Sequence, residues 1–270
     1  MTLRQLAARN PTTFFVARRL AVSAPTILAV LTVIFFAMRT LPGDPAYAIL
    51  GDIATAEAVE ALREKLGLNL PVGQQYLDFI TGILQGDLGQ SLVFNRPVLG
   101  EIARVLPYTI ELTIASILIG CVIGIPLGIL SALYRNRMFD YITRVLSLVA
   151  MMTRATRSSM LEVLGEDYIR TARAKGAPRR IVVMRHALRN ALIPVVTIVG
   201  LYFALIIGNS VLIETVFTRP GLGSLIIGSL DNRDYPMVQG LLVVYALIIV
   251  VVNLLTDLSY SLIDPRVKRS

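Results

Sequence analysis

The sequence predicts an all-α integral membrane protein with about four full transmembrane helices and both termini in the cytoplasm. Three observations predict this fold class. Hydrophobic residues make up 55% and charged residues only 16% of the 270 residues, whereas soluble domains carry about 25% charged residues. Apolar runs of the roughly 20 residues that a bilayer-spanning helix needs recur along the chain. The basic residues gather beside those runs, which is the positive-inside pattern of membrane proteins.

Four segments have the length and apolar character of a transmembrane helix. They are residues 20–38, 110–133, 191–213 and 239–262. We expect the first to be a retained span and not a signal peptide, because no small-residue cleavage site closes it and Arg39 follows directly. The third contains Pro194, Gly200 and Gly208, which spans tolerate when neighbouring helices cover the backbone.

The charges between the apolar runs predict the orientation. Residues 40–101 contain eight acidic and three basic side chains, whereas residues 135–189 contain twelve Lys and Arg side chains. The segment 40–106 is therefore expected outside and 134–189 in the cytoplasm. Two short helices are expected in the outward loop, at 55–66 with Thr55 as N-cap and Gly67 as its stop, and at 74–84. We expect one transmembrane domain over residues 1–270.

Residues 141–163 do not fit this pattern. The segment begins like a span, but arginines interrupt it after about ten apolar positions, which are too few to cross a bilayer as a helix. Two interpretations stay open. The segment is either an interfacial amphipathic helix or the fused ends of two spans whose middle is missing.

Several functional classes are excluded by what the chain contains. A single Cys121 and a single His186 exclude a disulfide framework and a Cys or multi-His metal site. None of the three lysines follows a glycine, so no phosphate-binding loop of the Gly-Lys-Ser/Thr type can form. We therefore expect a non-catalytic chain that binds no cofactor or metal. The net charge of +8 does not indicate nucleic acid, because the basic residues follow the apolar runs.

The cytoplasmic segment 166–176 is expected to form a short helix. Asp167 lies at its N-terminus, where an anion suits the helix dipole, and Gly176 is a suitable stop. Charge alone is equally typical of a solvated basic loop, but the small residues favour a helix that a partner approaches closely. The candidate docking residues are Asp167, Tyr168, Arg170, Thr171, Ala172, Ala174, Lys175 and Gly176.

Polar side chains within or near the spans are a second class of candidates. A polar group inside a membrane is energetically costly, so its presence there indicates a functional role. Asn209, Glu214 and Asn253 are the candidates for a translocation path or gate. For Glu214 we favour the alternative that it lies at the membrane interface.

Sequence motifs along the chain resemble one family of transport proteins. The motif RTARAKG at 170–176, followed by HALRNALIP at 186–194, is similar to the cytoplasmic "EAA" loop of ABC-importer permeases of the dipeptide, oligopeptide and nickel family. Arg170 and Thr171 stand where the general pattern has Glu and Ala. Further matching motifs, in chain order, are LPGDP at 41–45, GDLGQS at 86–91, GIPLG at 124–128, ETVF at 214–217, PGLG at 220–223, DYP at 234–236 and DPR at 264–266.

The resemblance implies a permease subunit in the cytoplasmic (inner) membrane of a bacterium or archaeon, surrounded by lipid. Its implied partners are cytoplasmic ABC ATPase subunits that bind ATP and Mg, a second homologous permease and an extracytoplasmic substrate-binding protein. The cargo would be a peptide or nickel. The segment 168–176 would be the coupling helix that sits in a groove of the ATPase.

This chain departs from the family pattern of six spans. The third and fourth spans are expected to be cut out near Ala150, a loss of roughly 45–50 residues. The loss of a pair of spans leaves the orientation of all later segments in the membrane unchanged. It would, however, remove part of the wall of the translocation path. A transport-inactive shortened permease is therefore one alternative function. A stand-alone channel or secondary transporter is a weaker alternative, because ionisable residues are nearly absent from the middle of the spans.

Overall fold

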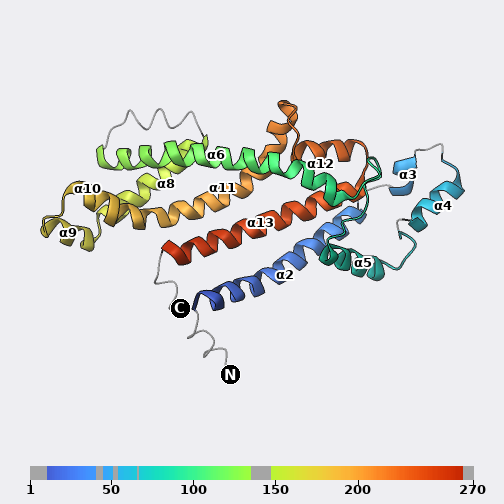
Figure 1. Cartoon of the computed structure of the whole chain (residues 1–270), viewed down its shortest axis with the longest axis horizontal. Helices are drawn as coiled ribbons and strands as arrows, with labels where there is room; N and C mark the ends of the chain where they lie inside the picture. Colours follow the sequence, from blue (N-terminus) through green and yellow to red (C-terminus); the bar gives the residue numbers. More distant parts are fainter. Residues whose placement is uncertain (1–10, 41–44, 51–53, 66, 135–146, 264–270) are drawn as a thin grey trace, which may run out of the picture. The chain divides into compact units, whose positions relative to one another are not determined.

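The computed structural model describes residues 11–40, 45–50, 54–65, 67–134 and 147–263. These residues are almost entirely helical (Figure 1), and their only extended pairing is an isolated bridge between Gln90 and Pro97. They fall into two compact units. Unit 1 contains the described residues within 11–20, 112–206 and 251–263, and unit 2 contains those within 21–111 and 207–250. The single domain expected over the whole chain stays a prediction.

Four long helices carry the predicted spans: α2 (Pro11–Thr40), α6 (Val98–Tyr134), α11 (Leu188–Val216) and α13 (Tyr235–Ile263). Within the described residues, four segments are long and apolar enough to cross a membrane: Ala21–Thr40, Val98–Leu133, Arg179–Val216 and Tyr235–Ser259. The all-α fold with four spans is confirmed.

Helix α6 includes residues that were expected in the outward loop. Helix α6 begins at Val98, although the span was expected from about residue 110 and the loop up to residue 106. Glu101 and Arg104, which were counted with the outward loop, lie on this helix. In the structure they form an ion pair of 2.7 Å one helical turn apart, and Glu101 is buried. The 37-residue helix is longer than a bilayer core requires.

Unit 2 contains the short helices of the outward loop, which are α3 (Pro45–Leu50), α4 (Ala56–Lys65) and α5 (Val72–Gln85), and the later helix α12 (Leu222–Asp231). The Thr55 hydroxyl accepts a hydrogen bond from the Ala58 N–H at 3.3 Å, and Gly67 has a φ of +66°, so the predicted cap and stop of α4 are confirmed. The side chains of Phe79, Ile80 and Ile83 on α5 pack against α2. The predicted motif residues Pro42 and Gly43 lie outside the described residues.

Unit 1 contains the cytoplasmic helices α8 (Ser147–Leu164), α9 (Asp167–Ala174) and α10 (Arg179–Ile181), and a π-helical turn η1 (Val182–Ala187) that leads into α11. Helix α8 packs closely on α6, since a Cβ added to Gly128 would lie 2.6 Å from the Thr156 Cβ. It is not among the helices long and apolar enough to be candidate spans. Residues 141–146, where the ambiguous segment starts, lie outside the described residues.

Candidate functional site

Helix α9 is the predicted docking helix, and its ends are defined by the local sequence. Asp167 occupies its first turn, and Arg173 its last turn, as the helix dipole favours. The Gly176 N–H donates to the Arg173 carbonyl at 2.9 Å, and the Ala177 N–H donates to the Ala172 carbonyl at 3.2 Å. Gly176 has a φ of +80°, which a side chain would strain. The expected glycine stop is therefore present, and Gly176 itself is exposed.

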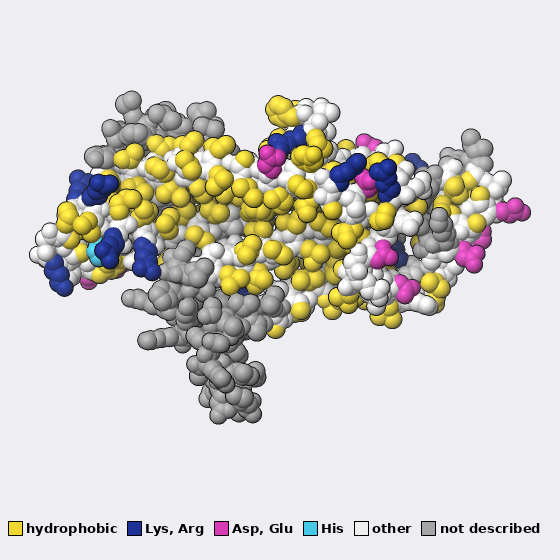
Figure 2. Space-filling model, viewed as in Figure 1, with side chains coloured by type: hydrophobic (Ala, Val, Ile, Leu, Met, Phe, Trp, Pro, Cys, Tyr) yellow, Lys and Arg dark blue, Asp and Glu magenta, His cyan; other side chains and the backbone are white. Residues whose placement is uncertain are grey.

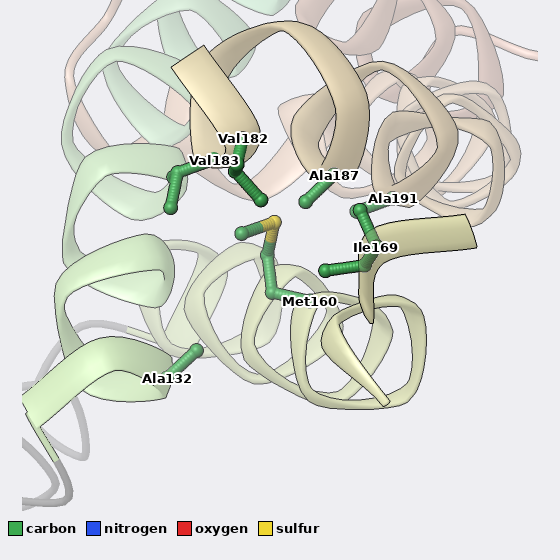
Figure 3. Packing of buried hydrophobic residues seen from close by; sticks show 7 residues of the cluster. All are labelled: Ala132, Met160, Ile169, Val182, Val183, Ala187 and Ala191. Atoms are coloured by element: carbon green, nitrogen blue, oxygen red, sulfur yellow. The ribbon is translucent and has the colours of Figure 1, made fainter. Parts of the chain in front are cut away.

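The inner face of α9 is anchored by one apolar side chain. Ile169 is completely buried in a group of side chains that we call the α9 cluster. The cluster joins residues from α6, α8, α9, η1 and α11, and its members are Ala132, Met160, Ile169, Val182, Val183, Ala187 and Ala191. Figure 3 shows the Met160 and Ile169 side chains pointing toward each other and toward Ala187. Ile169 was not among the predicted site residues, although its position between exposed polar neighbours indicates a buried face.

The outer face of α9 is polar, basic and composed of small or flexible side chains. Arg170, Thr171, Arg173, Ala174 and Lys175 are all exposed, and Lys and Arg side chains gather around α9 and α10 in Figure 2. Six of the eight predicted docking residues therefore lie on this short helix, and Lys175 and Gly176 follow its end. Not all of the eight lie on its outer face.

Three of the predicted docking residues make contacts within the chain. Ala172 is half-buried against the α9 cluster, so a bulky side chain there would displace the helix before it met a partner. The Tyr168 hydroxyl accepts a hydrogen bond of 2.7 Å from the Asn190 amide of α11. Asp167 pairs with Arg170 at 3.5 Å, but both side chains are largely exposed, and such pairs contribute little.

The predicted gate candidate Glu214 is engaged in a buried network at the N-terminus of α12, which we call the α12 cap. The residue is 1% exposed. It accepts hydrogen bonds from the Thr109 hydroxyl at 2.6 Å and from the backbone N–H groups of Gly223 and Ser224 at 2.7 and 3.2 Å. The Leu222 N–H in turn donates to the Thr109 hydroxyl at 2.8 Å. The free N–H groups of a helix start favour an anion there.

A second buried carboxylate, Asp234, was not predicted. Its oxygens accept hydrogen bonds from the Ser91 hydroxyl and from the backbone N–H groups of Leu92, Val93 and Met237. It thereby ties the loop after α5 to the start of α13. Its position just before the first turn of a helix was the available signal, because Asp is a favoured N-cap residue.

The other two gate candidates are exposed. The side chain of Asn209 lies on α11 in unit 2, and that of Asn253 lies on α13 in unit 1. Of the three gate candidates, Asn209 and Glu214 thus belong to unit 2 and Asn253 belongs to unit 1. Within the parts of the chain that the structure describes, no three His, Cys, Asp or Glu side chains form a group that could hold a metal ion.

Two segments of the chain match family models of known proteins. Residues 12–113 match the N-terminal model of the "binding-prot-dependent transport system membrane comp", and residues 146–269 match "binding-protein-dependent transport system inner membrane component". The chain belongs to this family of transport permeases. As an inner membrane component it is a non-catalytic subunit, and the ATPase of such a system is a separate chain.

Relatives of this permease share more than a third of its residues. The "Glutathione transport system permease protein GsiC" of Pectobacterium atrosepticum is 37% identical, and its counterpart of Salmonella choleraesuis is 39% identical. In both comparisons 94% of this chain and 98% of the relative are covered. The resemblance to ABC-importer permeases is confirmed.

The same alignments are longer than the chain. They run over 302 positions, whereas 94% of this 270-residue permease is about 254 residues. About 48 positions of the relatives, which is 302 minus 254, therefore have no counterpart here. Two spans and a short loop have that length, in agreement with the expected loss of a span pair.

Proposed function

We propose that this permease imports short peptides delivered by an extracytoplasmic binding protein, and that α9 couples it to a separate ATPase that binds ATP and Mg. A second homologous permease would complete the translocation path. The observation that carries the coupling proposal is the two-sided character of α9. Its inner face is fixed by Ile169, whereas its outer face presents small and basic side chains.

The α9 cluster supports a mechanical role for this helix. Ile169 packs with side chains from α6, α8, η1 and α11, and close-packed interiors transmit displacements and do not absorb them. A movement imposed on α9 by an ATPase would therefore reach two spans directly, α6 and α11. A solvated loop without a buried anchor would move alone.

The relatives support a peptide as cargo. Their names assign them to glutathione transport, and glutathione is a tripeptide. A nickel cargo has less support, since it would have to pass a chain with one histidine and one cysteine. The exposed amides of Asn209 and Asn253 are proposed to face the path or the second permease, because an amide in contact with lipid is costly.

Two substitutions on opposite faces of α9 test the coupling proposal. Arg173→Glu reverses a charge on the outer face, and we expect the cognate ATPase to be lost from the purified complex. Ile169→Ala leaves the outer face intact, so the ATPase should co-purify while peptide-stimulated ATP hydrolysis falls. Ile181→Ala, at an exposed isoleucine of α10, is the matched control and should change neither. Normal co-purification and normal hydrolysis in both α9 variants would refute the proposal.

A transport measurement separates this function from that of an inactive shortened permease. The permease, its partner permease, the ATPase and the binding protein are reconstituted in vesicles with a labelled dipeptide. ATP-dependent uptake is expected. If the complex assembles and hydrolyses ATP but takes up no peptide, the chain is a transport-inactive form. If uptake proceeds without the ATPase, the chain is a secondary transporter.

A further inference from the structure

A cavity of about 450 Å³ lies within unit 2, on the side of the chain that the charge distribution places outside. Small-ligand sites in proteins have volumes of about 300–1,000 Å³. Its walls come from the end of α2, from α5, from the loop that follows α5 and from the start of α13. Residues 87–91 of the GDLGQS motif and Pro236 of the DYP motif are part of these walls. Neither α9 nor the α12 cap contributes to it.

Arg39, at the end of α2, is held in place on this cavity. Its guanidinium carbon lies 3.6 Å from the centre of the Phe35 ring. Its Nε and Nη2 atoms both donate to the Gln75 side-chain oxygen. Gln75 is itself fixed, because its amide nitrogen donates to the carbonyls of Leu68 and Leu70 at 3.1 and 2.7 Å. The guanidinium is thus oriented by neutral groups, and none of these contacts neutralises its charge.

Asp78 supplies a negative charge to the same cavity. It lies on α5, three residues after Gln75, and it lines the cavity together with Arg39. Among the residues that the structure describes, neither Arg39 nor Asp78 forms an ion pair. Two opposite charges that line one cavity and do not pair with each other can each bind an oppositely charged group of a ligand.

Two further polar side chains of the lining, Asp87 and Ser91, form hydrogen bonds within the fold. The Asp87 carboxylate accepts a hydrogen bond of 2.8 Å from the Gly89 N–H, and the Ser91 hydroxyl donates to Asp234. Phe79, Ile83, Leu88 and Val243 contribute apolar surface to the same lining. The lining therefore offers one positive group and one negative group that form no ion pair among the described residues, an apolar wall, and the uncharged amides of Gln90, Asn95 and Gln239.

We propose that this cavity binds a short zwitterionic peptide. The peptide carboxylate would bind the Arg39 guanidinium, which presents donors suited to a carboxylate. The peptide ammonium would bind Asp78, and the side chains would lie on the apolar wall. Apolar contact is non-directional. The cavity would therefore recognise the charged ends of the peptide and accept different peptide side chains. This inference rests on the proposed function for its cargo class, and it adds a receiving site on the outward side.

Peptides with one charged end removed test the proposal. The permease is purified with its partner permease in lipid nanodiscs, without ATPase. Binding of Ala-Phe, of its C-terminal amide and of its N-acetyl form is measured by calorimetry. The wild type is expected to bind Ala-Phe at least about tenfold more tightly than either blocked form, since hydrogen bonds to charged groups contribute about 1.5–3 kcal/mol.

Each substitution should remove one preference only. Arg39→Gln is expected to bind Ala-Phe and its amide equally, while it still discriminates against the N-acetyl form. Asp78→Asn is expected to do the reverse. Arg63→Gln and Glu57→Gln change charges on α4 away from the cavity lining and should leave all three affinities unchanged. Thermal unfolding of each variant identifies any loss of fold.

Two results would overturn the inference. One is the absence of Ala-Phe binding to the wild type, and the other is an unchanged preference for the free carboxylate in a folded Arg39→Gln variant. A different result would refute the proposed coupling function. In that case the ATPase would not associate through α9, but the permease in nanodiscs would still bind the peptide.

Discussion

The α9 cluster in unit 1 and the α12 cap in unit 2 are both buried, but different forces hold them. The α9 cluster consists of apolar side chains from five elements, with Ile169 and Met160 fully buried. The α12 cap centres on one carboxylate, Glu214, and three hydrogen-bond donors. Apolar contact is non-directional, whereas a buried hydrogen-bonded network is satisfied in one geometry only.

This difference indicates which region can move. The α9 cluster contains no directional bonds among its apolar side chains, so it can shift as one packed unit and keep its contacts. A small shift of α12 would instead leave a buried carboxylate and several N–H groups without partners, which is costly. We therefore expect the coupling region to adjust during transport while α12 stays fixed to α11 and to the start of α6.

The largest expected effect comes from Glu214→Gln. The substitution retains the shape of the side chain but places an amide NH₂ among N–H donors and removes the charge. The carboxylate oxygen that accepts from Gly223 and Ser224 would be lost as an acceptor if the amide NH₂ took its place. We expect the free energy of unfolding to fall by roughly 3–6 kcal/mol, because a hydrogen bond to a charged group contributes about 1.5–3 kcal/mol. Thermal unfolding in detergent, followed by circular dichroism, measures it.

Glu111→Gln is the matched control for that prediction. Glu111 pairs with Arg219 at 2.9 Å, but its side chain is 70% exposed. Its loss should cost less than about 1 kcal/mol. If both substitutions lower the free energy of unfolding by the same amount, the buried α12 cap is no more important for stability than the surface ion pair, which would contradict this account.

The second prediction concerns the stability of the α9 cluster. Ile169→Ala should lower the free energy of unfolding by about 2–4 kcal/mol, because it leaves a cavity among buried side chains. Ile181→Ala removes the same atoms from a side chain that is 46% exposed and should cost far less. A loss near zero for Ile169→Ala would mean that α9 is not anchored through its inner face.

The third prediction uses two glycines of α12. A Cβ at Gly223 would collide with the backbone of Val211 and with the Glu214 carboxylate, whereas a Cβ at Gly228 would meet nothing within 4 Å. Gly223→Ala should therefore destabilise the protein by about 1–3 kcal/mol. Gly228→Ala should be neutral or stabilising by up to about 1 kcal/mol, since alanine favours a helix. If Gly223→Ala is also neutral, α12 is not packed tightly on α11.

The smallest expected effect is that of Tyr168→Phe. It removes the hydrogen bond from Asn190, which lies at the surface between α9 and α11. A neutral hydrogen bond contributes about 0.5–1.5 kcal/mol, and we expect the lower end of that range. ATPase co-purification should be unchanged. Loss of the ATPase in this variant would instead place Tyr168 in the docking contact.

The sequence predicted features that depend on local or periodic patterns. The four apolar runs, the Thr55 cap and the stops at Gly67 and Gly176 all follow from residues close together in the chain. It did not predict the start of α6, because the mutual neutralisation of Glu101 and Arg104 is visible only once the helix is formed.

The two buried carboxylates show why the rest could not be predicted. Thr109 and Glu214 are 105 residues apart, and Ser91 and Asp234 are 143 residues apart. Nothing near Glu214 in the sequence shows whether it meets lipid headgroups, a gate or a helix start. The same holds for Arg39 and Gln75, whose contact requires α2 and α5 to be packed together.

The most direct test of the coupling role is site-specific photocrosslinking to the ATPase. A genetically encoded diazirine residue is placed at Ala174, on the exposed outer face of α9, and in a second variant at Leu201, on an exposed apolar position of α11. We predict that irradiation of the assembled complex links position 174 to the ATPase and position 201 to no ATPase. An assembled complex in which position 174 gives no such product would contradict the proposal that α9 is the docking helix.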